Sequence, residues 1–172
     1  AMIIASESEL DEILSRPNAA DVEWAKGFEG PLLLLGAGGK MGPTLARRAK
    51  RAAEEAGREL RVIAVSRYSS ATAREHLEQW GIETISADLL DREQLATLPE
   101  APHIVYMAAR KFGSTGSEYL TWGMNTYLPS IVAERYRYAR IIAMSSGNVY
   151  PFVPVSSGGA TEGTPLQPVG EY

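Results

Sequence analysis

The feature that most constrains the fold is a short apolar run that leads into a cluster of glycines. Residues 32–35 are four leucines, and Gly36, Gly39 and Gly42 follow at a spacing of three, with Gly38 as an extra glycine. In such a unit the first glycine permits a tight turn, the middle ones let the backbone approach a phosphate, and the last lets a helix pack against the strand. We therefore predict a strand, turn and helix that can hold the pyrophosphate of a dinucleotide.

Downstream of this turn, short apolar segments alternate with segments of helical pattern. Strands are expected at 32–35, 61–66, 83–86, 104–108 and 140–144, and helices at 41–56, 71–80, 91–98 and 117–138. The strands are apolar without alternation, as is typical when helices cover both faces of a sheet. With right-handed crossovers, this predicts an α/β fold with a doubly wound parallel sheet, the Rossmann strand order 3-2-1-4-5, and three α/β/α layers.

The segments at both ends differ from this alternation. Ser6 and Glu9 form a capping-box pattern that predicts a short helix, whereas residues 19–30 have no clear period and are expected to be a connector. Residues 151–172 are rich in proline and glycine. We therefore expect an N-terminal helix and connector over 1–30, an NAD(P)-binding Rossmann domain over 31–150, and a loop over 151–172.

Composition excludes several classes of protein. A net charge of -4 implies no basic face for nucleic acid, and no apolar run approaches the roughly 20 residues that span a bilayer. The chain has no cysteine and two histidines, so we expect no metal site. The lack of cysteine fits a reduced, cytoplasmic setting. The expected partner is a small-molecule substrate.

The end of the second predicted strand bears on the choice of cofactor. The glycine pattern alone also fits a flavodoxin-like or methyltransferase domain, but the strand and helix around it favour a dinucleotide. No acidic residue lies between Glu59 and Glu75, where an NAD site usually has one for the ribose 2′-OH. Ser66 and Arg67 stand there instead and suit a 2′-phosphate, so NADP is favoured over NAD. A solvated Arg67 is the alternative.

Asp88 and Leu89 follow the third predicted strand. At that place an aspartate can accept a hydrogen bond from the adenine amino group. The alternative is that Asp88 is a turn or helix-cap residue.

Further motifs make residues 32–172 resemble the extended short-chain dehydrogenases/reductases, also called the NAD-dependent epimerase/dehydratase family. Residues 105–109 (VYMAA) are similar to the motif at the end of the family's fourth strand, and Lys111 and Asn125 stand where members place a cofactor-contacting lysine and a central-helix asparagine. Residues 144–150 (MSSGNVY) are similar to the family's S-S-x-x-V-Y-G motif, with Pro151 in place of the glycine.

The resemblance implies an NAD(P)-dependent oxidoreductase, epimerase or dehydratase acting on a hydroxy or keto compound, with nucleotide sugars as one class. Residues 151–172 would form an active-site loop. Ser146 would hydrogen-bond the substrate oxygen, and Tyr172 would act as a general acid or base. The lysine of Y-x-x-x-K and the substrate-binding segment are absent from the chain. For Ser146 the alternative is a hydroxyl that satisfies backbone groups at a strand end. A non-catalytic NAD(P)-binding sensor or scaffold is the other reading of the whole chain. By analogy, a homodimer through residues 91–98 and 117–138 is expected. The predicted cofactor-binding residues are Gly36, Gly38, Gly39, Lys40, Met41, Gly42, Ser66, Arg67, Asp88, Leu89, Met107, Ala108, Ala109, Lys111 and Asn125.

Overall fold

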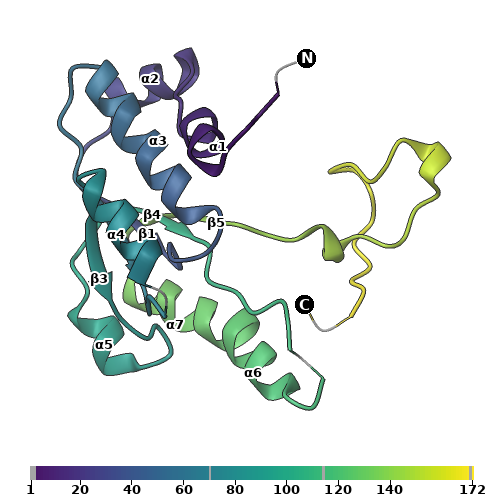
Figure 1. Ribbon diagram of the computed structural model, residues 1–172. Helices are drawn as coiled ribbons and strands as arrows, with labels where there is room; N and C mark the ends of the chain where they lie inside the picture. Colours follow the sequence, from purple (N-terminus) through teal and green to yellow (C-terminus); the bar gives the residue numbers. More distant parts are fainter. Residues whose placement is uncertain (1–2, 70, 114, 171) are drawn as a thin grey trace.

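A parallel sheet forms the centre of the molecule (Figure 1). The computed structural model describes residues 3–69, 71–113, 115–170 and 172. Within these residues the sheet has five strands in the order β3-β2-β1-β4-β5, every neighbouring pair parallel. The order confirms the predicted 3-2-1-4-5 arrangement. The strands are β1 (Leu32–Leu35), β2 (Val62–Ser66), β3 (Glu83–Ser86), β4 (His103–Tyr106) and β5 (Arg140–Ala143).

Helices cover the two faces of the sheet, which gives the predicted three layers. On one face, α3 (Gly42–Glu55) and α4 (Ala71–Gln79) pack on Leu32 and Leu34 of β1 and on the β2 side chains that point to the same face. On the other face, α5 (Arg92–Thr97) and α7 (Leu128–Arg135) pack on Leu33 and Leu35. Successive leucines of β1 therefore point into opposite cores, and all four are buried because helices lie on both sides.

Two helices precede the sheet and lie against α3 (Figure 1). The first, α1 (Glu7–Leu14), begins at Ser6, whose hydroxyl accepts from the Glu9 N–H at 3.1 Å, as the sequence predicts. The expected connector over 19–30 is wrong, because α2 (Ala19–Lys26) occupies most of it. Asn18 caps α2 together with Asp21, each side chain accepting from the other residue's backbone N–H. This reciprocal cap stabilises a helix too short to show a period.

The helix expected over 117–138 is divided into three segments. These are α6 (Glu118–Trp122), the π-helix η1 (Gly123–Tyr127) and α7. Pro129 has no N–H to donate to the carbonyl four residues before it, so the regular α-helical ladder cannot run through this point. Across the described ranges, no helix has both the length and the apolar character needed to cross a bilayer.

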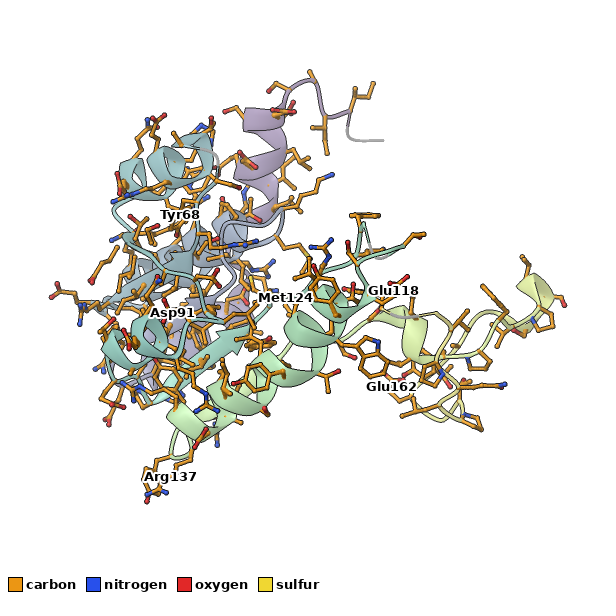
Figure 2. All side chains as sticks on the ribbon, turned by 90° about the horizontal axis from the view of Figure 1, so that it is seen from below. Tyr68, Asp91, Glu118, Met124, Arg137 and Glu162 are labelled. Carbon is orange, nitrogen blue, oxygen red and sulfur yellow. The ribbon has the colours of Figure 1, made fainter. Side chains whose placement is uncertain are left out.

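Beyond β5, the chain leaves the sheet and then returns toward it (Figure 1). It contains two single 3-10 turns, η2 (Gly147–Val149) and η3 (Val155–Ser157). Glu162, labelled in Figure 2, belongs to this segment. Two backbone bonds bring the chain back, from the Gln167 N–H to the Val149 carbonyl and from the Val169 N–H to the Asn148 carbonyl, both at 2.9 Å. Residues 150–166 therefore form a loop closed at its base.

Candidate functional site

The glycine turn between β1 and α3 is held by close contacts that exclude side chains. Gly36 has a φ of +88°, and a Cβ there would lie 2.6 Å from the backbone nitrogen of Ala108. A Cβ on Gly42 would overlap the carbonyl of Ala37. The first and last glycines are thus required by the fold itself, because the turn is pressed against the end of β4 and the helix against the turn.

The middle of the same turn is open. A Cβ on Gly39 would meet only the Gly36 carbonyl oxygen, at 3.6 Å. Among the described residues, the backbone N–H groups of Gly38, Lys40 and Met41 have no hydrogen-bond acceptor. They stand at the N-terminus of α3, which has no side-chain cap and no acidic residue in its first turn. Free donors at the positive end of a 14-residue helix suit a phosphate group.

A cavity of about 270 Å³ opens at this turn, beside the carboxyl ends of β1, β2, β3 and β4. This is where ligands bind in open parallel sheets. Most of the predicted cofactor residues meet in it. Those that line the cavity are Gly36, Gly38, Gly39, Ser66, Arg67, Asp88, Leu89, Met107, Ala108 and Ala109.

Polar side chains at the ends of β2 and β3 face this cavity with capacity for hydrogen bonds. Ser66 lies directly against Gly38, where a Cβ would overlap its hydroxyl oxygen. Arg67 is exposed and its guanidinium has no partner among the described residues. Asp88 accepts from the Leu90 N–H through Oδ1 at 3.0 Å, which is the turn role considered from the sequence, while its Oδ2 has no donor in the described part of the chain.

The cavity also has a lining that the sequence did not predict. Tyr68 is held by a hydrogen bond from its hydroxyl to the Ala64 carbonyl at 2.8 Å, and burial raises its pKa to about 12. Met124 belongs to η1, so its place depends on how that helical segment packs on the sheet. Of the unpredicted lining residues, only Tyr68 and Ser69 could have been expected from the sequence, because they directly follow the predicted pair Ser66 and Arg67. The unpredicted lining residues are Tyr68, Ser69, Ala73, Ala87 and Met124.

Asn125 contacts backbone, not the cavity. Its Oδ1 accepts from the Arg110 N–H at 2.8 Å and its Nδ2 donates to the Arg110 carbonyl at 3.1 Å. Asn125 belongs to the π-helix η1, and its side-chain amide therefore holds the loop that follows β4 in place. Lys40, Met41, Gly42 and Lys111 also lie outside the cavity lining.

The two predicted catalytic residues lie on the segment beyond β5. The Ser146 hydroxyl oxygen accepts from the Asn148 N–H at 3.1 Å and so caps η2. This is the alternative considered from the sequence, a hydroxyl that satisfies a backbone group after a strand. Its own O–H donates to no described residue. The Lys111 ammonium lies 5.7 Å from the ring centre of Tyr172, a cation–π distance. The loop after β4 thus places a positive charge beside Tyr172.

The donor set of the glycine cavity fits a dinucleotide. Its backbone N–H groups and Arg67 suit phosphates, and the free oxygen of Asp88 suits an amino group. Within the residues that the structure describes, no cluster of three or more His, Asp or Glu side chains could hold a metal ion.

A second, larger cavity of about 570 Å³ lies between α2, α3, β4 and β5. Its walls are mainly apolar, with Trp24, Phe28 and Ile142 among them. Ile142 is exposed here, and no described strand pairs with the outer edge of β5. The free N–H of Gly38 and the polar ends of β2 and β3 lie at the smaller cavity and not at this one.

The sequence matches no family model and no curated protein. In structure, the chain is similar to the ADP-L-glycero-D-manno-heptose-6-epimerase of Helicobacter pylori, with a TM-score of 0.68 and 20% identity over 90% of this chain and 49% of that chain. It is similar to the dTDP-glucose 4,6-dehydratase of Bacillus anthracis in complex with NAD (TM-score 0.65, 17% identity, 83% and 45% covered). It is also similar to the WbmG enzyme of Bordetella bronchiseptica in complex with NAD (TM-score 0.63, 18% identity, 85% and 46% covered). The chain spans less than half of each of these three proteins, and at such identities the similarity establishes the fold.

Proposed function

We propose that this chain is the cofactor-binding part of an extended short-chain dehydrogenase/reductase, of the NAD-dependent epimerase/dehydratase type. One observation carries the proposal: Gly38 with its free N–H, Ser66, Arg67 and Asp88 meet at one cavity beside the carboxyl ends of the strands. The motifs of the sequence and the similarity in fold to an epimerase and a dehydratase support it.

NADP is the proposed cofactor, with NAD as the alternative. The N–H groups of Gly38, Lys40 and Met41 would hold the pyrophosphate, and Asp88 would accept from the adenine amino group. Ser66 and the unpaired Arg67 would hold the 2′-phosphate. When bound, the cofactor supplies the group that accepts or donates a hydride.

The proposed chemistry of the chain's own residues is proton transfer at a substrate hydroxyl or carbonyl. The phenol of Tyr172 would take or give the proton, and the Lys111 ammonium lies 5.7 Å from the centre of its ring. The free O–H of Ser146 would donate to the substrate oxygen as negative charge develops there. The proposed substrate is a hydroxy or keto compound, with nucleotide sugars as the first class to test.

Calorimetry with the 172-residue chain tests the cofactor proposal. We expect NADP⁺ to bind more tightly than NAD⁺, and Arg67→Ala to weaken NADP⁺ binding about tenfold with little effect on NAD⁺. Arg137→Ala is the matched control, since Arg137 is an exposed arginine far from Tyr68 in Figure 2. Equal losses for both nucleotides would remove Arg67 from the 2′-phosphate site. Failure to bind either nucleotide would refute the proposed function.

A non-catalytic NAD(P)-binding module is the second candidate, and the capping role of Ser146 favours it. Mixing the chain with cofactor and a panel of nucleotide sugars, with sugar conversion followed by chromatography, tests the enzyme. Conversion that Ser146→Ala abolishes, with cofactor affinity unchanged, supports the enzyme. The module is supported if a protein that also carries the substrate-binding segment binds cofactor tightly and converts no sugar of the panel.

We also propose a homodimer that forms through α5 and the α6–α7 segment, by analogy with the family. Light scattering at working concentration tests this, and a monomeric mass would exclude it.

A further inference from the structure

The turn that follows β2 contains an unusual backbone conformation. Tyr68 has a φ of +47°, and in the described part of the chain it is the only residue other than glycine with a positive φ. A bulky side chain disfavours this left-handed region, so contacts elsewhere must hold the residue in place.

Two contacts hold Tyr68. Its hydroxyl donates to the Ala64 carbonyl of β2 at 2.8 Å, and its ring lies close enough to Gly38 for an added Cβ there to come within 3.6 Å of Cδ1. The side chain lies among those between α4 and the strands (Figure 2). Burial raises the pKa of Tyr68 to about 12, so the phenol remains a hydrogen-bond donor at neutral pH. The ring thus ties the turn to β2 on one side and to the glycine turn on the other.

This anchor decides where the neighbouring polar groups lie. Ser66, Arg67 and Ser69, on either side of the left-handed residue, all line the same cavity. Together they present two hydroxyls and an unpaired guanidinium. Such a set of donors, with one positive charge, complements the charged oxygens of a phosphate monoester.

We propose that Tyr68 is a positioning residue that selects the 2′-phosphorylated dinucleotide by fixing the turn 66–69 against β2. The inference rests on the proposed function, since it assigns a selecting residue to the same cavity. Tyr68 lines the same cavity, and its proposed effect on the phosphate site is to set the direction in which Ser66, Arg67 and Ser69 face.

The test is the ratio of NADP⁺ to NAD⁺ affinity, measured by calorimetry on the 172-residue chain. Tyr68→Phe keeps the ring and removes the bond to Ala64, and we expect NADP⁺ affinity to fall roughly threefold to tenfold with NAD⁺ affinity unchanged. Tyr68→Asn tolerates the left-handed backbone but has no ring to reach Ala64, and it should lower the ratio further. Tyr138→Phe is the matched control, because Tyr138 is 88% exposed.

Each result has a distinct meaning. A lower ratio in both Tyr68 variants, with thermal stability close to that of the wild type in Tyr68→Phe, supports the inference. An unchanged ratio, or equal losses for both nucleotides, overturns the role of Tyr68 while wild-type binding leaves the proposed function intact. If the wild type binds neither nucleotide, the proposed function fails and this inference fails with it.

Discussion

Gly39 and Gly42 look equivalent in the sequence, but their surroundings differ. A side chain at Gly42 would collide with the backbone of Ala37, whereas one at Gly39 would extend into open space next to the free N–H groups. The last glycine therefore serves the packing of α3, and the middle glycine is left free for a ligand. Stability and binding should respond separately to substitution at the two positions.

We predict that Gly42→Ala lowers the free energy of unfolding by about 1–3 kcal/mol, since the overlap is with backbone that cannot move aside. Gly39→Ala should change it by less than about 0.5 kcal/mol but weaken dinucleotide binding about tenfold or more. Urea denaturation and calorimetry measure the two effects. Gly27→Ala is the control, because no atom lies within 4 Å of its added Cβ. Loss of stability in Gly39→Ala would contradict the assignment.

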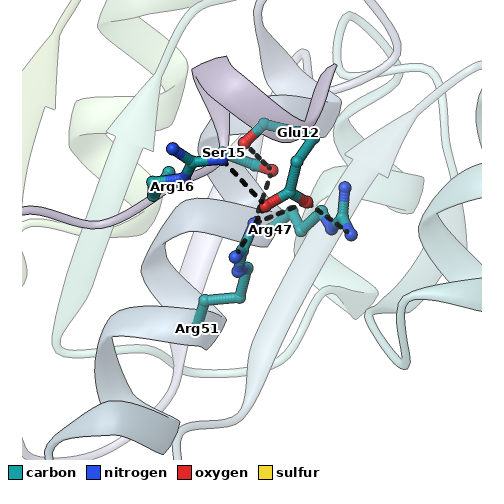
Figure 3. A network of polar contacts seen from close by, with 5 residues as sticks. All are labelled: Glu12, Ser15, Arg16, Arg47 and Arg51. Carbon is teal, nitrogen blue, oxygen red and sulfur yellow. Dashed lines mark hydrogen bonds and ion pairs between the residues drawn. The ribbon is translucent and has the colours of Figure 1, made fainter. Parts of the chain in front are cut away.

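At the scale of the element, charged pairs attach the N-terminal helices to α3 (Figure 3). Glu12 of α1 binds Arg51 through both carboxylate oxygens at 3.0 Å, and Arg47 lies 3.3 Å away. The hydrogen bond from Arg51, with the charges of Arg51, Arg47 and Arg16, lowers the pKa of Glu12. Asp21 of α2 pairs with Arg48. Burial opposes ionisation of Asp21, but the Asn18 N–H and Arg48 outweigh it and lower its pKa.

We predict that Glu12→Gln lowers the free energy of unfolding by about 1 kcal/mol at neutral pH, because one carboxylate serves several arginines. Since the folded pKa of Glu12 is lowered, its contribution is present above about pH 4.3 and disappears as the pH falls through the lowered value. The difference between variant and wild type should therefore vanish in acid, as measured by urea denaturation across pH. Glu23→Gln, which removes an exposed pair within α2, should have almost no effect. A pH-independent difference would contradict this account.

The elements that the sequence predicted well are those governed by local chemistry. The glycine turn, the Ser6 cap and the five strands are each specified by residues within a few positions of one another. The sequence did not reveal α2, because its signal was a reciprocal cap without a period. Nor did it reveal the π-helix or the place of Met124, because both depend on how the segment after β4 packs on the sheet. Tyr68 was missed because its role depends on a bond to β2 and on contact with the glycine turn.

At the scale of the whole molecule, two buried tyrosines and the half-buried Tyr68 join elements across both faces of the sheet. Tyr68 donates to Ala64, Tyr106 to the Met124 carbonyl at 3.4 Å, and Tyr136 to the Pro99 carbonyl at 3.1 Å. Burial raises the pKa of each to about 12.

We therefore predict that the fold weakens in alkali. A phenol with a raised folded pKa contributes fully below about pH 10, the value for an unfolded tyrosine, and its contribution is lost as the pH rises through 12. Between about pH 10 and about pH 12, ionisation of each tyrosine should lower the free energy of unfolding by about 1.4 kcal/mol per pH unit. Urea denaturation between pH 8 and 12 measures the loss, and a variant with phenylalanine at the three positions should lose much less. Equal pH dependence of variant and wild type would refute the prediction.

The outer edge of β5 has a consequence for handling the chain in solution. Ile142 and Met144 are exposed beside this edge, and a strand with free backbone groups can accept the backbone of another chain. The net charge of -4 provides only modest repulsion between copies. The outer edge of β5 is therefore a place where copies of the chain can associate as the concentration of a sample rises.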